Sequence, residues 1–166
     1  MTTRTFARWV APIAAQLRDN RTRVVEFARS LPADVWSKPS PLEGWSYKDL
    51  LAHIGKGNDQ ILQKLLRTVA AGERVDISIF SVDTNEANAR EVAARRHRSV
   101  DEVIAELEEA GDEIQEMLSQ LSDRDEHLRQ EDPPFMLVGF LRAVQRENHD
   151  LEHLAQLRAA LEEQPS

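Results

Sequence analysis

Residues 46–69, SYKDLLAHIGKGNDQILQKLLRTV, carry the pattern that decides the fold of this chain. Their apolar side chains recur at spacings of three and four residues, which place them on one face of an α-helix. Ser46, with Asp49 three residues later, is a variant of the capping box that begins a helix, and Gly72 suits the position just past a helix end. We therefore predict one amphipathic helix between Ser46 and Gly72, whose apolar face consists of Tyr47, Leu50, Leu51, Ile54, Ile61, Leu65 and Val69.

Two other segments, one on each side of this helix in the sequence, have the same periodicity. The first is residues 6–30, with Pro12 in its first turns, and a Pro-rich connection follows it. The other is residues 84–122, which we expect to be interrupted at His97-Arg98 and to restart at Ser99 with a second capping box. Both segments are predicted to be helical.

A fourth periodic segment follows Asp132. It places Pro133-Pro134 at the first positions of a helix that ends near Glu162. The stretch GERVDISIFSVD, residues 72–83, has no partner strand, so we expect a connection there. Four long amphipathic helices without a sheet predict an all-α fold, a four-helix bundle.

Composition limits the classes of function. The chain has 166 residues, the length of a single domain, and its 21 Lys and Arg against 29 Asp and Glu give a net charge of −8. An acidic protein repels phosphate backbones, so we expect no nucleic-acid partner. No apolar run is long enough to span a bilayer, and no signal peptide is recognisable, so we expect a cytoplasmic protein of bacterial type without a membrane partner. The absence of cysteine excludes disulfides and thiolate ligands.

The placement of histidine is the main chemical signal. His149 and His153 lie four residues apart, one turn along the last predicted helix, where both imidazoles can reach one ion. This pair and His53 lie beside the apolar faces of their helices and not on them. They are therefore either three solvated surface side chains or ligands that converge in a groove between two helices. Imidazoles are suitable ligands for Zn²⁺ or Ni²⁺.

Convergence of these histidines requires a particular topology. His53 lies early in its helix, whereas His149 and His153 lie well before the end of theirs, so the second and fourth helices must be antiparallel to align them. An extended connection after Gly72 is long enough to carry the chain back along the second helix. We therefore predict an up-down-down-up bundle with a long crossover between helices 2 and 3.

Residues 42–60, LEGWSYKDLLAHIGKGNDQ, resemble the second-helix signature of the DinB/YfiT-like superfamily, G-W-[ST]-x-[KR]-[DE]-x-x-x-H. This superfamily includes the N-terminal metal-binding domain of mycothiol-dependent maleylpyruvate isomerase. The later HDLEH, residues 149–153, resembles its paired-ligand motif, and residues 84–114 are also similar to family members. The resemblance implies a single DinB-like domain over residues 1–166 and a divalent metal, Zn²⁺ or Ni²⁺, on His53, His149 and His153.

The resemblance also implies a type of chemistry. It favours a metalloenzyme that activates water or a low-molecular-weight thiol against a small electrophilic substrate, as a thiol-dependent transferase or isomerase. Since the chain has no cysteine, any sulfur nucleophile must arrive as a cosubstrate. Two alternatives stay open: a non-catalytic helical binding module, and a toxin-resistance hydrolase of a related branch. An exposed helical face is also compatible with a homodimer.

Four other residues are candidates for the site. Trp36 and Trp45 flank the Pro-rich connection, where they either line a pocket beside the metal or close the end of the bundle. Asp150 and Glu152 neighbour the histidines and are either partners of ring N–H groups or solvated helix acids.

Overall fold

The computed structural model describes residues 4–54, 57–76, 78, 84–146 and 149–162. Helix α1 (Ala11–Ser30) begins later than predicted, directly before Pro12, whose fixed φ and missing N–H suit a first helical turn. It ends where Leu31 turns to an extended conformation, and the short 3-10 turn η1 (Ala33–Ser37) follows.

The second predicted helix is two helices, α2 (Tyr47–Ile54) and α3 (Gly57–Ala70), and their junction at residues 55–56 lies outside the described residues. The capping box that begins α2 is confirmed. The backbone N–H of Asp49 donates to Ser46 Oγ at 3.1 Å, and the N–H of Ser46 donates to Asp49 Oδ2 at 3.0 Å. Gly72 has φ of +69°, the left-handed conformation that the prediction of a helix end requires.

The third predicted segment is also two helices, with the break where the sequence placed it. Helix α4 (Thr84–Arg95) packs against α2, and α5 (Val100–Ser119) packs against α1 and α3. Ser99 caps α5, since its Oγ accepts from the N–H of Glu102 at 3.2 Å. The expected connection between α3 and α4 lies partly outside the described residues.

The start of the fourth helix was predicted wrongly. Pro133 and Pro134 do not begin a helix; they lie in the turn between two short antiparallel strands, β1 (Arg129–Gln130) and β2 (Phe135–Met136). The Gln130 side chain holds this turn, because its Nε2 donates to the carbonyl of Pro133 and to that of Val75, both at 3.0 Å. The residues before β1 include the 3-10 turn η3 (Asp123–His127).

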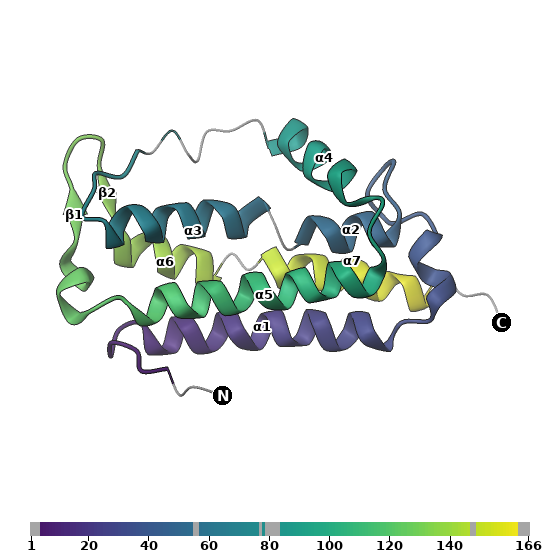
Figure 1. The fold of residues 1–166 in the computed structure, drawn as a ribbon, viewed down its shortest axis with the longest axis horizontal. Helices are drawn as coiled ribbons and strands as arrows, with labels where there is room; N and C mark the ends of the chain where they lie inside the picture. The colour runs from purple at the N-terminus through teal and green to yellow at the C-terminus, as the bar shows by residue number, and fades with distance from the viewer. Residues whose placement is uncertain (1–3, 55–56, 77, 79–83, 147–148, 163–166) are drawn as a thin grey trace.

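Two helices then complete the bundle: α6 (Leu137–Arg146) and α7 (His149–Glu162). Figure 1 shows that α2, α3 and α5 run in one direction, while α1, α6 and α7 run in the other. The predicted up-down-down-up order is therefore confirmed, and α2 and α7 are antiparallel neighbours.

The core consists of two apolar clusters, one toward each end of the bundle. One joins α2 to the adjoining halves of α1, α5 and α7, and the other joins α3 and α6 to the remaining halves of α1 and α5. Between them lies a polar layer in which Arg21, Asp59 and Asp150 meet. Among the described residues, no helix is both long enough and apolar enough to cross a membrane.

Candidate metal centre

The three predicted histidines meet where α2 packs against α7. His53 lies in the last turn of α2, His149 begins α7, and His153 follows one turn later. Their imidazoles face one another through Nε2: His149 Nε2 lies 3.2 Å from His53 Nε2 and 2.9 Å from His153 Nε2. One nitrogen from each ring lies within 4.8 Å of the others. The antiparallel arrangement thus brings together residues that are about a hundred positions apart in the sequence.

This arrangement fits a divalent metal ion. Nitrogen ligands that share one Zn²⁺ at about 2.0–2.1 Å lie about 3 Å apart, as His149 Nε2 does from His53 Nε2 and from His153 Nε2. A ring nitrogen has either one N–H or one lone pair, so His149 Nε2 cannot form a good hydrogen bond with both neighbours. A cation that accepts all three lone pairs accounts for the arrangement better than hydrogen bonding does.

Burial keeps two of these rings neutral, which is the form that binds metals. Loss of solvent is the main cause that lowers the pKa of His53 to about 4 and that of His149 to about 3. The nearby His153 lowers both pKa values further, because like charges repel. At pH 7 both lone pairs are therefore available without the release of a proton.

Gln156 fixes the tautomer of His153, although the sequence argument did not identify it. Its Oε1 lies 2.6 Å from His153 Nδ1. A carboxamide oxygen can only accept a hydrogen bond, so Nδ1 carries the proton and the lone pair is on Nε2, which faces the other rings. The spacing of three residues along α7 could have suggested the pair. By contrast, His149 Nδ1 is buried without a hydrogen-bond partner among the described residues.

The two candidate tryptophans have different surroundings. Trp45 meets His53 edge-on, with ring centroids 5.1 Å apart and planes at 61°. Trp36 is buried in the apolar cluster at the α2 end of the bundle. Only Trp45 therefore has a ring contact with the histidine group among the described residues.

The two candidate acids also differ. Glu152 is exposed on α7. Asp150 instead accepts a hydrogen bond from Arg21, with Nε 2.8 Å from Oδ2. Asp59 binds the same guanidinium from α3 at 2.9 Å. Among the described residues, neither acid has a hydrogen bond to a ring N–H of the histidines. Asp150 belongs instead to an ion-pair network of Arg21, Asp59 and Asp150, which we call the Arg21 triad.

Burial strongly affects the Arg21 triad. It opposes the charge on Arg21, but attraction by the two carboxylates outweighs it and raises the pKa of that guanidinium above its usual value. Burial raises the pKa of Asp59 to about 6, against the attraction of Arg21. One guanidinium thus faces two carboxylates, Asp59, which is buried, and Asp150, which is partly buried, so the three side chains together carry one excess negative charge when both acids are ionised.

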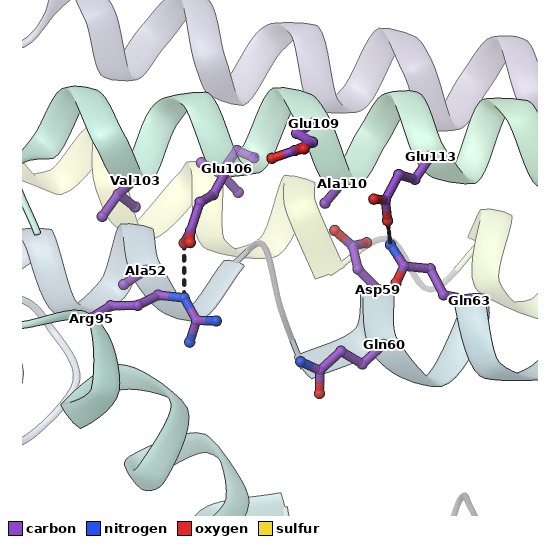
Figure 2. A pocket seen from close by; sticks show the side chains of 11 residues that line it. Ala52, Asp59, Gln60, Gln63, Arg95, Val103, Glu106, Glu109, Ala110 and Glu113 are labelled. Carbon is purple, nitrogen blue, oxygen red and sulfur yellow. Dashed lines mark hydrogen bonds and ion pairs between the residues drawn. The ribbon is translucent and has the colours of Figure 1, made fainter.

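A small acidic cavity of about 110 Å³ lies on the other side of Asp59, between α3 and α5 (Figure 2). Two of its glutamates have partners: Glu106 binds Arg95 at 3.0 Å, and Glu113 accepts from Gln63 Nε2 at 2.9 Å. Arg95, which comes from the end of α4, is thus held within the protein by Glu106 and by Glu91. These ion pairs attach α4 to α5 and leave little room for a ligand.

A protein-family model matches most of this chain. Residues 17–152 match the family model described as the mycothiol maleylpyruvate isomerase N-terminal domain. No curated protein sequence matches the chain.

Solved structures show the same fold. An uncharacterised protein from Escherichia coli UTI89 aligns with a TM-score of 0.72 and 16% identity, over 92% of each chain. The mycothiol-dependent maleylpyruvate isomerase aligns with a TM-score of 0.69 and 16% identity, over 89% of this chain and 60% of the isomerase. A variant of that isomerase with one histidine replaced by alanine gives the same values. The present chain therefore spans about 60% of the length of that enzyme.

Proposed function

Because the chain belongs to the family of mycothiol maleylpyruvate isomerase N-terminal domains, we propose that it is a metal-dependent enzyme of the DinB-like type. In this proposal His53, His149 and His153 hold one divalent ion, Zn²⁺ or Ni²⁺, and the reaction joins or transfers a low-molecular-weight thiol to a small electrophile. The observation that carries the proposal is the meeting of three Nε2 atoms at 2.9 and 3.2 Å. Residues 1–166 form one such domain in this proposal.

The chemistry of the site follows from the number of its ligands. Three protein nitrogens leave at least one coordination position open, and a divalent metal lowers the pKa of a water or thiol that binds there. Gln156 holds His153 in the tautomer that presents Nε2. Burial keeps the other two rings neutral, and the ring of Trp45 packs against that of His53.

A thiol cosubstrate is favoured over water because the related isomerase is mycothiol-dependent. Since this chain has no cysteine, the sulfur nucleophile of the proposal comes from outside the chain. The isomerisation of maleylpyruvate itself is not part of the proposal, because the chain spans about 60% of that enzyme. A non-catalytic helical module is less favoured, since such a module gives no reason for three imidazoles, two buried and one partly buried, to share one point.

Metal analysis tests the site directly. The protein is purified without a histidine tag, and bound metal is measured by mass spectrometry for wild type, His53→Ala and His149→Ala. We expect stoichiometric metal in wild type and its loss in both variants. His127→Ala is the matched control, because His127 is exposed in η3 and is not one of the three histidines that meet.

The metal content of the two histidine variants decides whether His53 and His149 are ligands. Metal that stays equally bound in both site variants would rule out this centre. A second assay mixes the metal-loaded protein with an electrophilic probe and with glutathione, mycothiol or bacillithiol in turn. Turnover without any thiol would favour the hydrolase alternative.

A further inference from the structure

A second and larger cavity adjoins the histidine group. Its volume is about 680 Å³, and it lies among α1, α3, α5 and α6, with His149 and Asp150 of α7 in its lining. Small-molecule sites commonly enclose about 300–1,000 Å³, so this cavity has the volume of such a site. It begins between exposed side chains of α1 and α5, such as Arg18 and Asp112, and reaches inward to His149.

The inner walls of this cavity are mostly apolar. Leu62 and Ile114 are buried in its lining, and Phe140 and Val144 are partly buried there. Gly111 of α5 also lines it and leaves space beside Arg21, since a Cβ atom at this position would lie 3.2 Å from Arg21 Cγ. Aromatic and aliphatic side chains of this kind favour a ligand with an apolar body.

The charged groups of the lining disfavour an anion. Five carboxylates line the cavity against three guanidinium groups. The one buried cation, Arg21, is already used: it donates to both Asp59 and Asp150, and its Nη1 donates to the carbonyl of Leu107 at 2.9 Å. Arg29, at the rim, pairs with Glu108 at 2.8 Å. Away from the metal position itself, a carboxylate or phosphate ligand would thus enter a largely apolar space whose side chains offer more carboxylates than guanidinium groups and no free inner cation.

We propose that this cavity binds the electrophilic substrate of the metal centre, and that this substrate is an uncharged molecule with an apolar body. The proposal rests on the proposed function, because it assigns the substrate class of that same site. The side chains of the lining disfavour a carboxylate or phosphate on the body of the substrate, whereas a neutral aromatic or aliphatic body loses water from its surface and gains contact with Leu62, Ile114 and Phe140.

Two fluorescent probes that share one ring system test the charge requirement. N-phenyl-1-naphthylamine is uncharged, and 1-anilinonaphthalene-8-sulfonate carries a negative sulfonate on the same body. We expect saturable binding of the uncharged probe to wild-type protein and binding of the sulfonate that is weaker by about tenfold or more, because its charge would be buried unpaired. Equal or tighter binding of the sulfonate would overturn the proposal, and this comparison needs no variant.

A matched pair of substitutions tests the location. Ala143→Phe narrows the cavity, since Ala143 lines it, whereas Ala105→Phe makes the same change on an exposed position of α5 outside the lining. We expect the first to weaken binding of the uncharged probe by about tenfold and the second to leave it unchanged. Val144→Phe serves in place of Ala143→Phe if circular dichroism shows that the latter is unfolded. Unchanged binding in a folded cavity variant would also overturn the proposal.

The same titration separates this proposal from the metal centre. In His53→Ala protein the cavity lining is intact, because His53 is not part of it, and we expect the uncharged probe still to bind. Stoichiometric metal without probe binding would contradict the cavity proposal alone. Probe binding without metal in wild type would contradict the proposed function and leave the cavity as a binding site for uncharged compounds.

Discussion

Single side chains decide how well the histidine group can hold an ion. Gln156 lies 2.6 Å from His153 Nδ1, whereas Glu152, one residue before His153, is exposed. Partners that orient a ligand histidine commonly contribute about 10–100-fold to metal affinity. We expect Gln156→Ala to weaken Zn²⁺ binding by a factor in this range, measured by competition with a chromophoric chelator.

Glu152→Ala is the control for this experiment. It removes a polar side chain from the same helix without touching the Nδ1 hydrogen bond, so its Zn²⁺ affinity should equal that of wild type. If both variants bind Zn²⁺ as wild type does, Gln156 has no role in positioning His153.

The buried rings also determine how stability depends on pH in the metal-free protein. His53 and His149 have folded pKa values of about 4 and 3, below the value of about 6.5 for an unfolded histidine. Between the folded and the unfolded pKa values, the unfolded chain therefore binds more protons than the folded protein does. The stability that these neutral rings contribute is present above about pH 6.5 and is lost as pH falls toward 4 and 3.

The contribution of these rings can be isolated with a double variant. Asp59 acts in the opposite sense, because its raised pKa of about 6 favours the folded state as pH falls through that range. We expect the chelator-treated wild type to lose more stability between pH 7 and pH 4.5 than His53→Gln/His149→Gln does, as measured by urea denaturation. Parallel pH profiles for the two proteins would show that the rings are not buried as neutral groups.

The sequence predicts the ligand histidines of this site but not the partners of its charged side chains. The positions of His53, His149 and His153 follow from helical spacing and from the direction of two helices, both of which a sequence contains. The partner of Asp150 does not follow in this way. Arg21 lies on α1, 129 residues away, and its choice of Asp150 and Asp59 depends on how α1, α3 and α7 pack.

At the level of secondary-structure elements, α5 approaches α1 closely at one glycine. Gly111 lies within α5, where replacing glycine by alanine would ordinarily stabilise the helix by about 0.5–1 kcal/mol. Here the new Cβ would lie 3.2 Å from Cγ of Arg21, whose guanidinium is fixed by three acceptor groups and cannot move aside freely. We expect Gly111→Ala to lower the free energy of unfolding instead of raising it, as measured by urea denaturation.

A helix-propensity control completes this test. Gly139→Ala changes another helical glycine, in α6, where a new Cβ would meet only Met136 Cβ at 3.9 Å, an ordinary contact. It should stabilise the protein. A gain in stability for Gly111→Ala as well would mean that the packing between α1 and α5 adapts without cost.

Local signals explain which element boundaries could be predicted. The capping boxes at Ser46 and Ser99 act within four residues, so the sequence around them specifies the start of α2 and α5. Strands β1 and β2 have two residues each, too few to show a period. Their pairing is supported by contacts of Gln130 with Val75, a residue of the distant connection after α3. For this reason Pro133-Pro134 resembled a helix start although they form a turn.

In the bundle as a whole, a metal ion on the three histidines would connect helix α2 to helix α7. His53 comes from α2 and the other two histidines from α7, and the up-down-down-up order brings these distant helices side by side. The polar layer between the two apolar clusters is therefore the level at which an ion would hold the bundle together. A ligand that binds only the folded state stabilises it by an amount set by its concentration relative to Kd.

Thermal unfolding measures this cross-link. At a free Zn²⁺ concentration of about 100 Kd the folded state gains about 2.7 kcal/mol, which for a chain of this length raises Tm by roughly 5–10 °C. We expect this rise for wild type and for the surface control His127→Ala, and its absence in His53→Ala, because the two histidines left on α7 cannot connect it to α2. An equal rise in Tm for His53→Ala would show that Zn²⁺ stabilises the protein elsewhere, and the assignment of His53 as a ligand would then be wrong.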